Sequence, residues 1–187
     1  MSKGKLFIIS GASGVGKSTV LSKVMAARDD LQFSVSATTR KPRPGEIEGV
    51  SYYFVSEETF RDMIAADAFL EYDEHNMTLY GTPREQVEQK LLNGNVILDI
   101  EPNGAFAVQK QRPDATLIFI TPPSMEVLEN RLRSRGDTSE DQILLRLDRA
   151  KWEMDQIPKY HYAVTNDQVD ACAEKILHII AEKADEE

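Results

Sequence analysis

Short apolar runs alternate with longer amphipathic stretches along this chain. The runs at 5–9, 96–100, 116–121 and 162–165 are rich in branched aliphatic residues, which is typical of strands buried on both faces. Two further strands are predicted at 33–36 and 52–55, separated by a loop that contains Pro and Gly at 41–49. Helical periodicity is found at about 17–27, 57–66, 82–92, 124–133 and 139–155, and from 169 onward. Strands that alternate with helices predict an α/β fold with a mostly parallel sheet covered on both faces.

Two of the predicted helices begin at capping signals. Thr82 is followed by Pro83 and Glu85, so Thr82 is predicted to be the N-cap and Glu85 to complete a capping box. Ser139 and Gln142 have the same spacing before the helix at 139–155.

Composition narrows the classes of partner. The chain has 187 residues and a net charge of −9, which suits one domain and argues against a nucleic-acid polymer as partner. Basic residues nevertheless cluster at 40–43 and 131–135, as either sites for small anions or solvated surface charges. No apolar run is long enough for a membrane span or a secretory signal, and Cys172 has no second cysteine to pair with. These features predict a cytoplasmic protein and leave a homo-oligomer open.

The sharpest motif is a phosphate-binding P-loop placed between a predicted strand and a predicted helix. Its residues are Gly11, Ala12, Ser13, Gly14, Val15, Gly16, Lys17 and Ser18, followed by Thr19. Glycines allow the backbone to approach phosphate closely, Lys17 supplies a charge, and the Ser18 hydroxyl can bind Mg²⁺. A chance match in a glycine-rich turn and a dinucleotide fingerprint are the alternatives, but the order of the glycines does not fit the fingerprint.

Asp99 is the one acid in the apolar run at 96–100 and fits the acid that P-loop enzymes place beside the phosphates. Such an aspartate can hold a water bound to Mg²⁺, whereas the alternative is an ordinary acid at the end of a strand.

Several ordered motifs beyond the P-loop resemble the guanylate kinase family, in its bacterial type, over about residues 5–182. They lie at 34–46, 49–54, 69–72, 80–82, 131–136 and 166–167. The resemblance implies one P-loop NTPase domain, a three-layer α/β/α fold with a parallel central sheet, a GMP-binding insert and a helical lid. The core would comprise 1–32, 83–125 and 156–187, the GMP-binding segment 33–82 and the lid 126–155.

The resemblance also implies roles for particular residues. The GMP phosphate would be bound by Ser36, Arg40, Arg43, Tyr52 and Tyr80, the base by Glu71 and Thr82, and Asp99 and Glu101 would complete the GMP site. ATP would bind the P-loop residues and Asn166. The catalytic cations would be Lys17, Arg43, Arg131, Arg135 and Arg146, and Mg²⁺ would be held by Ser18 and, through water, by Asp99. Thr82 is thus predicted both to read guanine and to cap a helix, two tasks that one hydroxyl does not easily combine.

The chain departs from the family pattern after Asp99, where an aspartate, a variable residue, Gln and Gly are usual. Here the run is Glu101, Pro102, Asn103 and Gly104. Glu101 is longer by one methylene, and Pro102 is interpreted as stiffening a turn. Ala12 is a milder departure at a position where proline is common.

The implied reaction is ATP + GMP → ADP + GDP with Mg²⁺, and dGMP as a further acceptor. A nucleotide phosphate is largely dianionic at neutral pH, so the acceptor requires no general base. Catalysis would rest on positioning and charge neutralisation under a closing lid. Two rivals remain: a kinase of this fold with another acceptor, and a non-catalytic binding module that resembles the family.

Overall fold

The computed structural model describes residues 4–75, 77–134 and 139–184. Its larger sheet has the strand order β2-β7-β1-β8-β9, and every neighbouring pair is parallel. These strands are β1 (Leu6–Gly11), β2 (Leu31–Phe33), β7 (Asn95–Asp99), β8 (Thr116–Thr121) and β9 (Tyr162–Thr165). The predicted parallel sheet is therefore confirmed.

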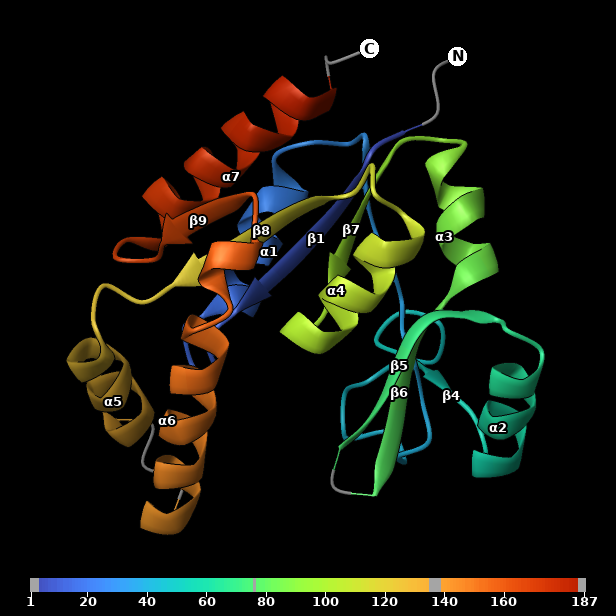
Figure 1. Cartoon of the computed structure of the whole chain (residues 1–187), viewed down its shortest axis with the longest axis horizontal. Helices are drawn as coiled ribbons and strands as arrows, with labels where there is room; N and C mark the ends of the chain where they lie inside the picture. The colour runs from blue at the N-terminus through green and yellow to red at the C-terminus, as the bar shows by residue number, and fades with distance from the viewer. Residues whose placement is uncertain (1–3, 76, 135–138, 185–187) are drawn as a thin grey trace.

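Helices cover both faces of this sheet (Figure 1). Successive side chains of a strand point to opposite faces, so Phe7 and Ile9 enter one core while Leu6 and Ile8 enter the other. The first core is closed by α1 (Lys17–Ala26) and α7 (Val169–Ala184), and the second by α3 (Arg84–Leu91) and α4 (Pro102–Gln111). This is the predicted three-layer α/β/α arrangement.

A second, mixed sheet lies beside the core with the order β4-β3-β6-β5. Its strands are β3 (Ala37–Thr38), β4 (Tyr53–Phe54), β5 (Phe69–His75) and β6 (Thr78–Pro83), and α2 (Glu57–Ala65) packs on it. A small apolar cluster joins sheet and helix, in which the Phe60 and Phe69 rings stack at 4.5 Å. The β5–β6 hairpin was not predicted.

Two helices, α5 (Met125–Ser134) and α6 (Glu140–Met154), project from the opposite side of the core (Figure 1). Leu128 and Leu132 of α5 and Leu147 of α6 pack in the same core as the P-loop residues Ala12 and Val15. A short 3-10 helix (Ile157–Lys159) then leads to β9. Within the ranges given above, no helix has both the length and the apolar character that a bilayer span requires.

The predicted strand at 33–36 is wrong. β2 ends at Phe33 and β3 begins at Ala37, so residues 34–36 cross between the two sheets. The Gln86 side chain takes the place of a strand partner: its Oε1 accepts the Val35 N–H at 3.1 Å, and its Nε2 donates to the Val35 carbonyl at 3.1 Å.

The capping prediction holds for Ser139 and fails for Thr82. Ser139 accepts the Gln142 N–H at 3.4 Å as the N-cap of α6. The N-cap of α3 is instead Pro83, whose side chain makes no capping hydrogen bond. The Thr82 hydroxyl donates to Glu71 Oε1 at 2.5 Å. The Thr82 hydroxyl therefore does not cap α3, and its role in binding guanine stays a prediction.

The interpretation of Pro102 as a stiffener of a turn is also wrong. Pro102 is the first residue of α4, a helix that was not predicted. A proline suits this position because the amide N–H at the start of a helix has no intrahelical acceptor.

Candidate functional site

The P-loop joins the carboxyl end of β1 to the amino end of α1. Gly14 and Gly16 have φ values of 85° and 91°, in the left-handed region that favours glycine. A side chain at Gly14 would also place its Cβ 2.6 Å from Leu132 Cδ2. Gly16 is the N-cap of α1, so the backbone N–H groups that follow lie at the positive end of a helix.

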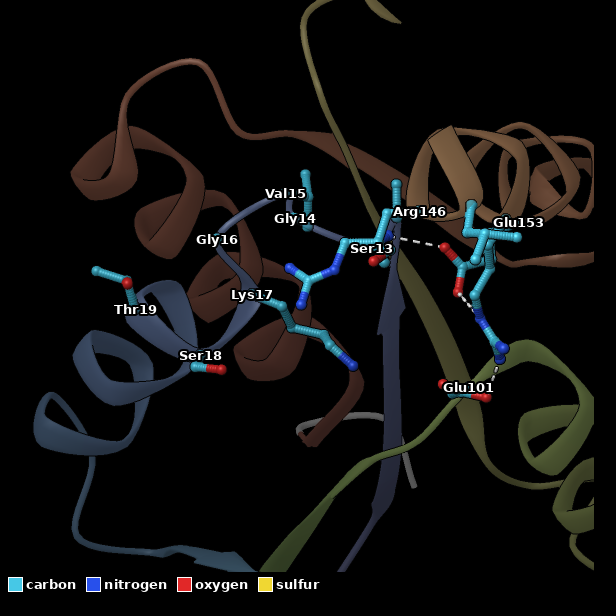
Figure 2. A pocket seen from close by; sticks show the side chains of 14 residues that line it. Ser13, Gly14, Val15, Gly16, Lys17, Ser18, Thr19, Glu101, Arg146 and Glu153 are labelled. Atoms are coloured by element: carbon cyan, nitrogen blue, oxygen red, sulfur yellow. Dashed lines mark hydrogen bonds and ion pairs between the residues drawn. The ribbon is translucent and has the colours of Figure 1, made fainter. Parts of the chain in front are cut away.

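A cavity of about 650 Å³ lies over this loop (Figure 2). It is called the donor pocket, because the resemblance implies that ATP, the phosphoryl donor, binds at the P-loop. It is lined by residues 11–19, by Glu101, and by Leu145, Arg146, Arg149 and Glu153 of α6. Figure 2 shows Arg146 pointing from α6 toward the P-loop, where a catalytic cation is predicted. The structure thus brings Arg146 together with the phosphate cradle.

Asp99 lies beside Lys17. The register of the parallel strands places Asp99 of β7 opposite Ile9 of β1, just before the P-loop. The Lys17 ammonium and the Asp99 carboxylate form an ion pair whose side chains are 21% and 24% exposed. The Ser18 residue is exposed at the start of α1.

Arg131, predicted to be a catalytic cation, and Asn166, predicted to bind ATP, both contact the P-loop at the Val15 carbonyl. The buried Asn166 donates its Nδ2 to the Val15 carbonyl at 2.8 Å. Arg131 donates to the Asn166 carbonyl at 3.1 Å and, at 3.4 Å, to the same Val15 carbonyl. Neither side chain lines the donor pocket, so in this structure both contact the backbone of the P-loop and not the space of the pocket. Arg135, a predicted catalytic arginine, lies outside the described residues.

A second cavity has a volume of about 500 Å³. It is called the acceptor pocket, because the resemblance implies that GMP, the phosphoryl acceptor, binds to its residues. It is lined by Lys17, Ser36, Arg40, Arg43, Tyr52, Glu71, Asp73, Thr78, Tyr80, Asp99, Ile100, Glu101 and Gly104. This set includes every residue predicted for GMP except Thr82, whose hydroxyl is bonded to the lining residue Glu71.

The cationic end of the acceptor pocket is organised by Glu46, which was not predicted. Both Glu46 oxygens accept from Arg40 at 2.6 Å, and Oε2 also accepts the Arg43 N–H at 2.7 Å. The Arg40 guanidinium holds the pKa of the Glu46 carboxyl down, at about 2. The Arg40 guanidinium also lies 4.8 Å from the centre of the Tyr52 ring. Arg40 is therefore held in one orientation at the mouth of the pocket.

The other end of the acceptor pocket is built around Glu71 of β5. Burial raises the pKa of the Glu71 carboxyl to about 7 from its ordinary 4.5, although the Thr82 hydroxyl bonds to it. A Cβ at Gly104 would lie only 2.8 Å from Glu71 Oε2, so any other residue there would displace the carboxylate from its present position. A half-buried carboxylate that lines the pocket suits a ligand that brings its own hydrogen-bond donors.

We expect Gly104→Ala to weaken acceptor binding without unfolding the protein. Alanine is the better helix former in α4, but its Cβ displaces the Glu71 carboxylate from its present position. The KM for GMP, the acceptor that the resemblance implies, should rise about 10- to 100-fold, because misplacement by about 1 Å is that costly in a preorganised site. Steady-state kinetics alongside a thermal melt would test this. Asn103→Ala, at the exposed preceding position of α4, is the control for the gain in helix propensity. An unchanged KM would show that Glu71 tolerates the methyl group.

The two pockets meet, because Lys17 and Glu101 line both of them. A P-loop cradle, an acid at the end of the adjacent strand, and a second pocket that begins at the P-loop lysine together define a P-loop kinase for a small phosphorylated acceptor.

Comparison with known proteins identifies the member of this class. A family model described as guanylate kinase matches residues 3–183. The chain is 48% identical to a guanylate kinase from Caldanaerobacter subterraneus subsp. tengcongensis, over 97% of this chain and 89% of the relative. A guanylate kinase from Thermus thermophilus is 46% identical, over 95% of this chain and 81% of the relative. The crystal structure of guanylate kinase from Anaplasma phagocytophilum superposes with a TM-score of 0.79 at 31% identity, over 99% of this chain and 88% of that one. The chain belongs to the guanylate kinase family, as its motifs indicated.

Some residues of the site carried no usable signal in the sequence. Arg149 and Glu153 are four positions apart on a helix, a spacing typical of surface ion pairs. Asp73 and Thr78 lie on the unpredicted hairpin. Gly104 was the one readable signal, since it keeps the glycine of the family pattern within a run that departs from it.

Proposed function

We propose that this protein transfers the γ-phosphoryl group of ATP, in line, to an oxygen of the GMP phosphate, giving ADP and GDP. The observation that carries the proposal is that Lys17 and Glu101 line both pockets, so a donor and an acceptor would meet at Lys17. We extend the proposal to dGMP, which has the same base and the same phosphate.

The P-loop amides and Lys17 would hold the phosphates of ATP, and Arg146 would face the transferred group from α6. Arg40 and Arg43, with the hydroxyls of Ser36, Tyr52 and Tyr80, would hold the GMP phosphate. Arg131 and Asn166 would act by supporting the P-loop.

Glu71 and Thr82 would select guanine. Guanine presents a ring N–H and an exocyclic amino group side by side, and the Glu71 carboxylate can accept from both. Adenine has no such donor pair and would add no partner to the Glu71 carboxylate beyond the Thr82 hydroxyl that already bonds to it.

Mg²⁺ fits the oxygen donors beside Lys17. The Ser18 hydroxyl and the Asp99 carboxylate are the ligand types that Mg²⁺ prefers, and in kinase sites it keeps several waters and shares phosphate oxygens. When bound, it would neutralise charge on the β- and γ-phosphates.

The division of the chain follows the same proposal. The core would comprise 1–32, 83–125 and 156–187, the GMP-binding segment 33–82, and the lid 126–155. The mixed sheet with α2 lies in the second of these parts, and α5 and α6 lie in the third.

An ADP-release assay with ATP and Mg²⁺ would test the function, comparing GMP, dGMP, AMP, CMP and UMP as acceptors. We expect kcat/KM for GMP to exceed that for AMP by at least about 10³-fold, because the wrong base leaves a buried polar group unpaired. Equal rates for GMP and AMP would favour a kinase with another acceptor. A folded protein that binds ATP but turns over none of the five would favour the non-catalytic binding module.

A further inference from the structure

A chain of polar contacts runs from the P-loop to the acceptor pocket through α6. The Ser13 N–H donates to Glu153 Oε2 at 2.7 Å, and Arg149 Nε donates to Glu153 Oε1 at 3.2 Å. The Arg149 Nη2 atom then forms an ion pair with Glu101 Oε2. Figure 2 shows these three contacts as dashed lines. They join segments that are 140 and 48 residues apart in sequence.

Glu153, at the P-loop end of this series of contacts, is buried. The Glu153 side chain is 3% exposed, and burial raises the pKa of its carboxyl despite the bonds from the Ser13 N–H and Arg149. A buried carboxylate that loses its partners is strongly destabilised. Glu153 therefore ties the position of α6 to the backbone of the P-loop.

Glu101, at the other end of this series of contacts, lies at both pockets. Glu101 lines the donor pocket and the acceptor pocket, whereas Arg149 lines only the donor pocket. An arginine fork can bond two carboxylates in different directions at once, which a lysine ammonium on a longer flexible stem does poorly. The extra methylene of Glu101, relative to the aspartate usual in the family, gives its carboxylate more reach toward α6.

We propose that Arg149 is a positioning residue that couples the two nucleotide sites through Glu101 and Glu153. A ligand in the acceptor pocket restrains Glu101. Arg149 then holds α6, with Arg146, over the P-loop, and Glu153 holds the Ser13 N–H. The presence of one nucleotide thereby favours the arrangement that the other needs, and by linkage the effect is reciprocal. This inference rests on the proposed function and names a device within the same site.

Binding coupling is the quantity to measure. Isothermal titration calorimetry would give the Kd of GMP with and without saturating Mg²⁺ and a non-hydrolysable ATP analogue. In the unmodified protein we expect the ATP analogue to tighten GMP binding about fivefold or more, the lower end of typical coupling. In Arg149→Met we expect this ratio to fall toward one, while GMP alone, whose pocket Arg149 does not line, binds within about threefold of its original Kd.

Four further variants separate coupling from general stability. Arg149→Lys keeps the charge without the fork, and Glu101→Asp shortens the reach, so both should also lower the ratio. Combining Glu101→Asp with Arg149→Met should lower it no further, because the two changes break one connection. Lys151→Met is the matched control, since Lys151 lies exposed on the same helix and pairs only with Asp148 among the ion pairs described.

The outcomes divide cleanly. No coupling in the unmodified protein, an unchanged ratio in Arg149→Met, or an equal loss in Lys151→Met would overturn the inference. A lower melting temperature and weaker binding of each nucleotide alone, with the ratio preserved, would assign Arg149 a purely structural role and also overturn it. ADP release with GMP is measured on the same preparations: without turnover in the unmodified protein the proposed function fails, whereas turnover with a preserved ratio defeats only the coupling.

Discussion

Replacing Lys17 with alanine should lower kcat for GMP phosphorylation by about 10³-fold or more, the range found when a charge that stabilises phosphoryl transfer is removed. Lys17 lines both pockets, so its charge is available to donor and acceptor phosphates alike. It also neutralises Asp99, and alanine would leave that carboxylate facing the phosphates without its cation. Both effects act in the same direction.

The measurement is ADP release at saturating ATP and GMP, with a thermal melt to show that the variant is folded. Lys23→Ala is the matched control, because Lys23 is an exposed lysine of the same helix and is paired with Asp170, away from both pockets. Its rate should be close to that of the unmodified protein. A Lys17→Ala rate within tenfold of the original would contradict the central place given to this residue.

Replacing Glu71 with glutamine should lower the preference for GMP over AMP by at least about 10²-fold, because the amide group presents a donor where guanine also presents donors. The change keeps the size of the side chain and its place beside Thr82. The measurement is the ratio of kcat/KM for the two acceptors. Glu74→Gln, on an exposed position of the same strand, is the control.

The pH dependence gives this prediction a second test. Burial raises the pKa of the Glu71 carboxyl to about 7, and guanine needs the ionised form. The KM for GMP should therefore fall as the pH rises through about 7. Below about pH 7 it should increase about tenfold for each unit by which the pH is lowered, as for a single titrating group. Glu71→Gln should lose this component and keep only the titration of the GMP phosphate near pH 6. Identical pH profiles for the two proteins would sink the assignment of Glu71 to the base.

Local sequence determined the parts of the structure that are contiguous in the chain. The P-loop could be predicted because its glycines, lysine and serine follow one another, and the backbone angles of Gly14 and Gly16 match what the motif requires. The parallel sheet could be predicted because strands buried on both faces leave short apolar runs such as β8. The residues assigned to GMP by the resemblance line one pocket or bond to a residue that does; their roles stay predictions until tested.

The β5–β6 hairpin could not be predicted from the local sequence, for a physical reason. The strand β5 carries polar side chains at Glu71, Asp73 and Glu74, and Tyr72 is 53% exposed, so it shows no run that marks a buried strand. Its register is set by pairing with β6 and by the packing of Phe69 on Phe60. Burial of Glu71, and with it the raised pKa, follows from that pairing.

Tertiary structure alone decided which partner each polar side chain took. Thr82 has the spacing of a helix cap, yet its hydroxyl donates to the Glu71 carboxylate, because the pairing of β5 with β6 places Glu71 directly opposite Thr82. Arg149 has the spacing of a surface ion pair, yet it also reaches Glu101, which is 48 residues away. The sequence by itself determined the phosphate cradle, the layered fold and the family. The contacts that join the two pockets required the folded chain, because hydrogen bonds between distant segments depend on three-dimensional proximity that no local pattern records.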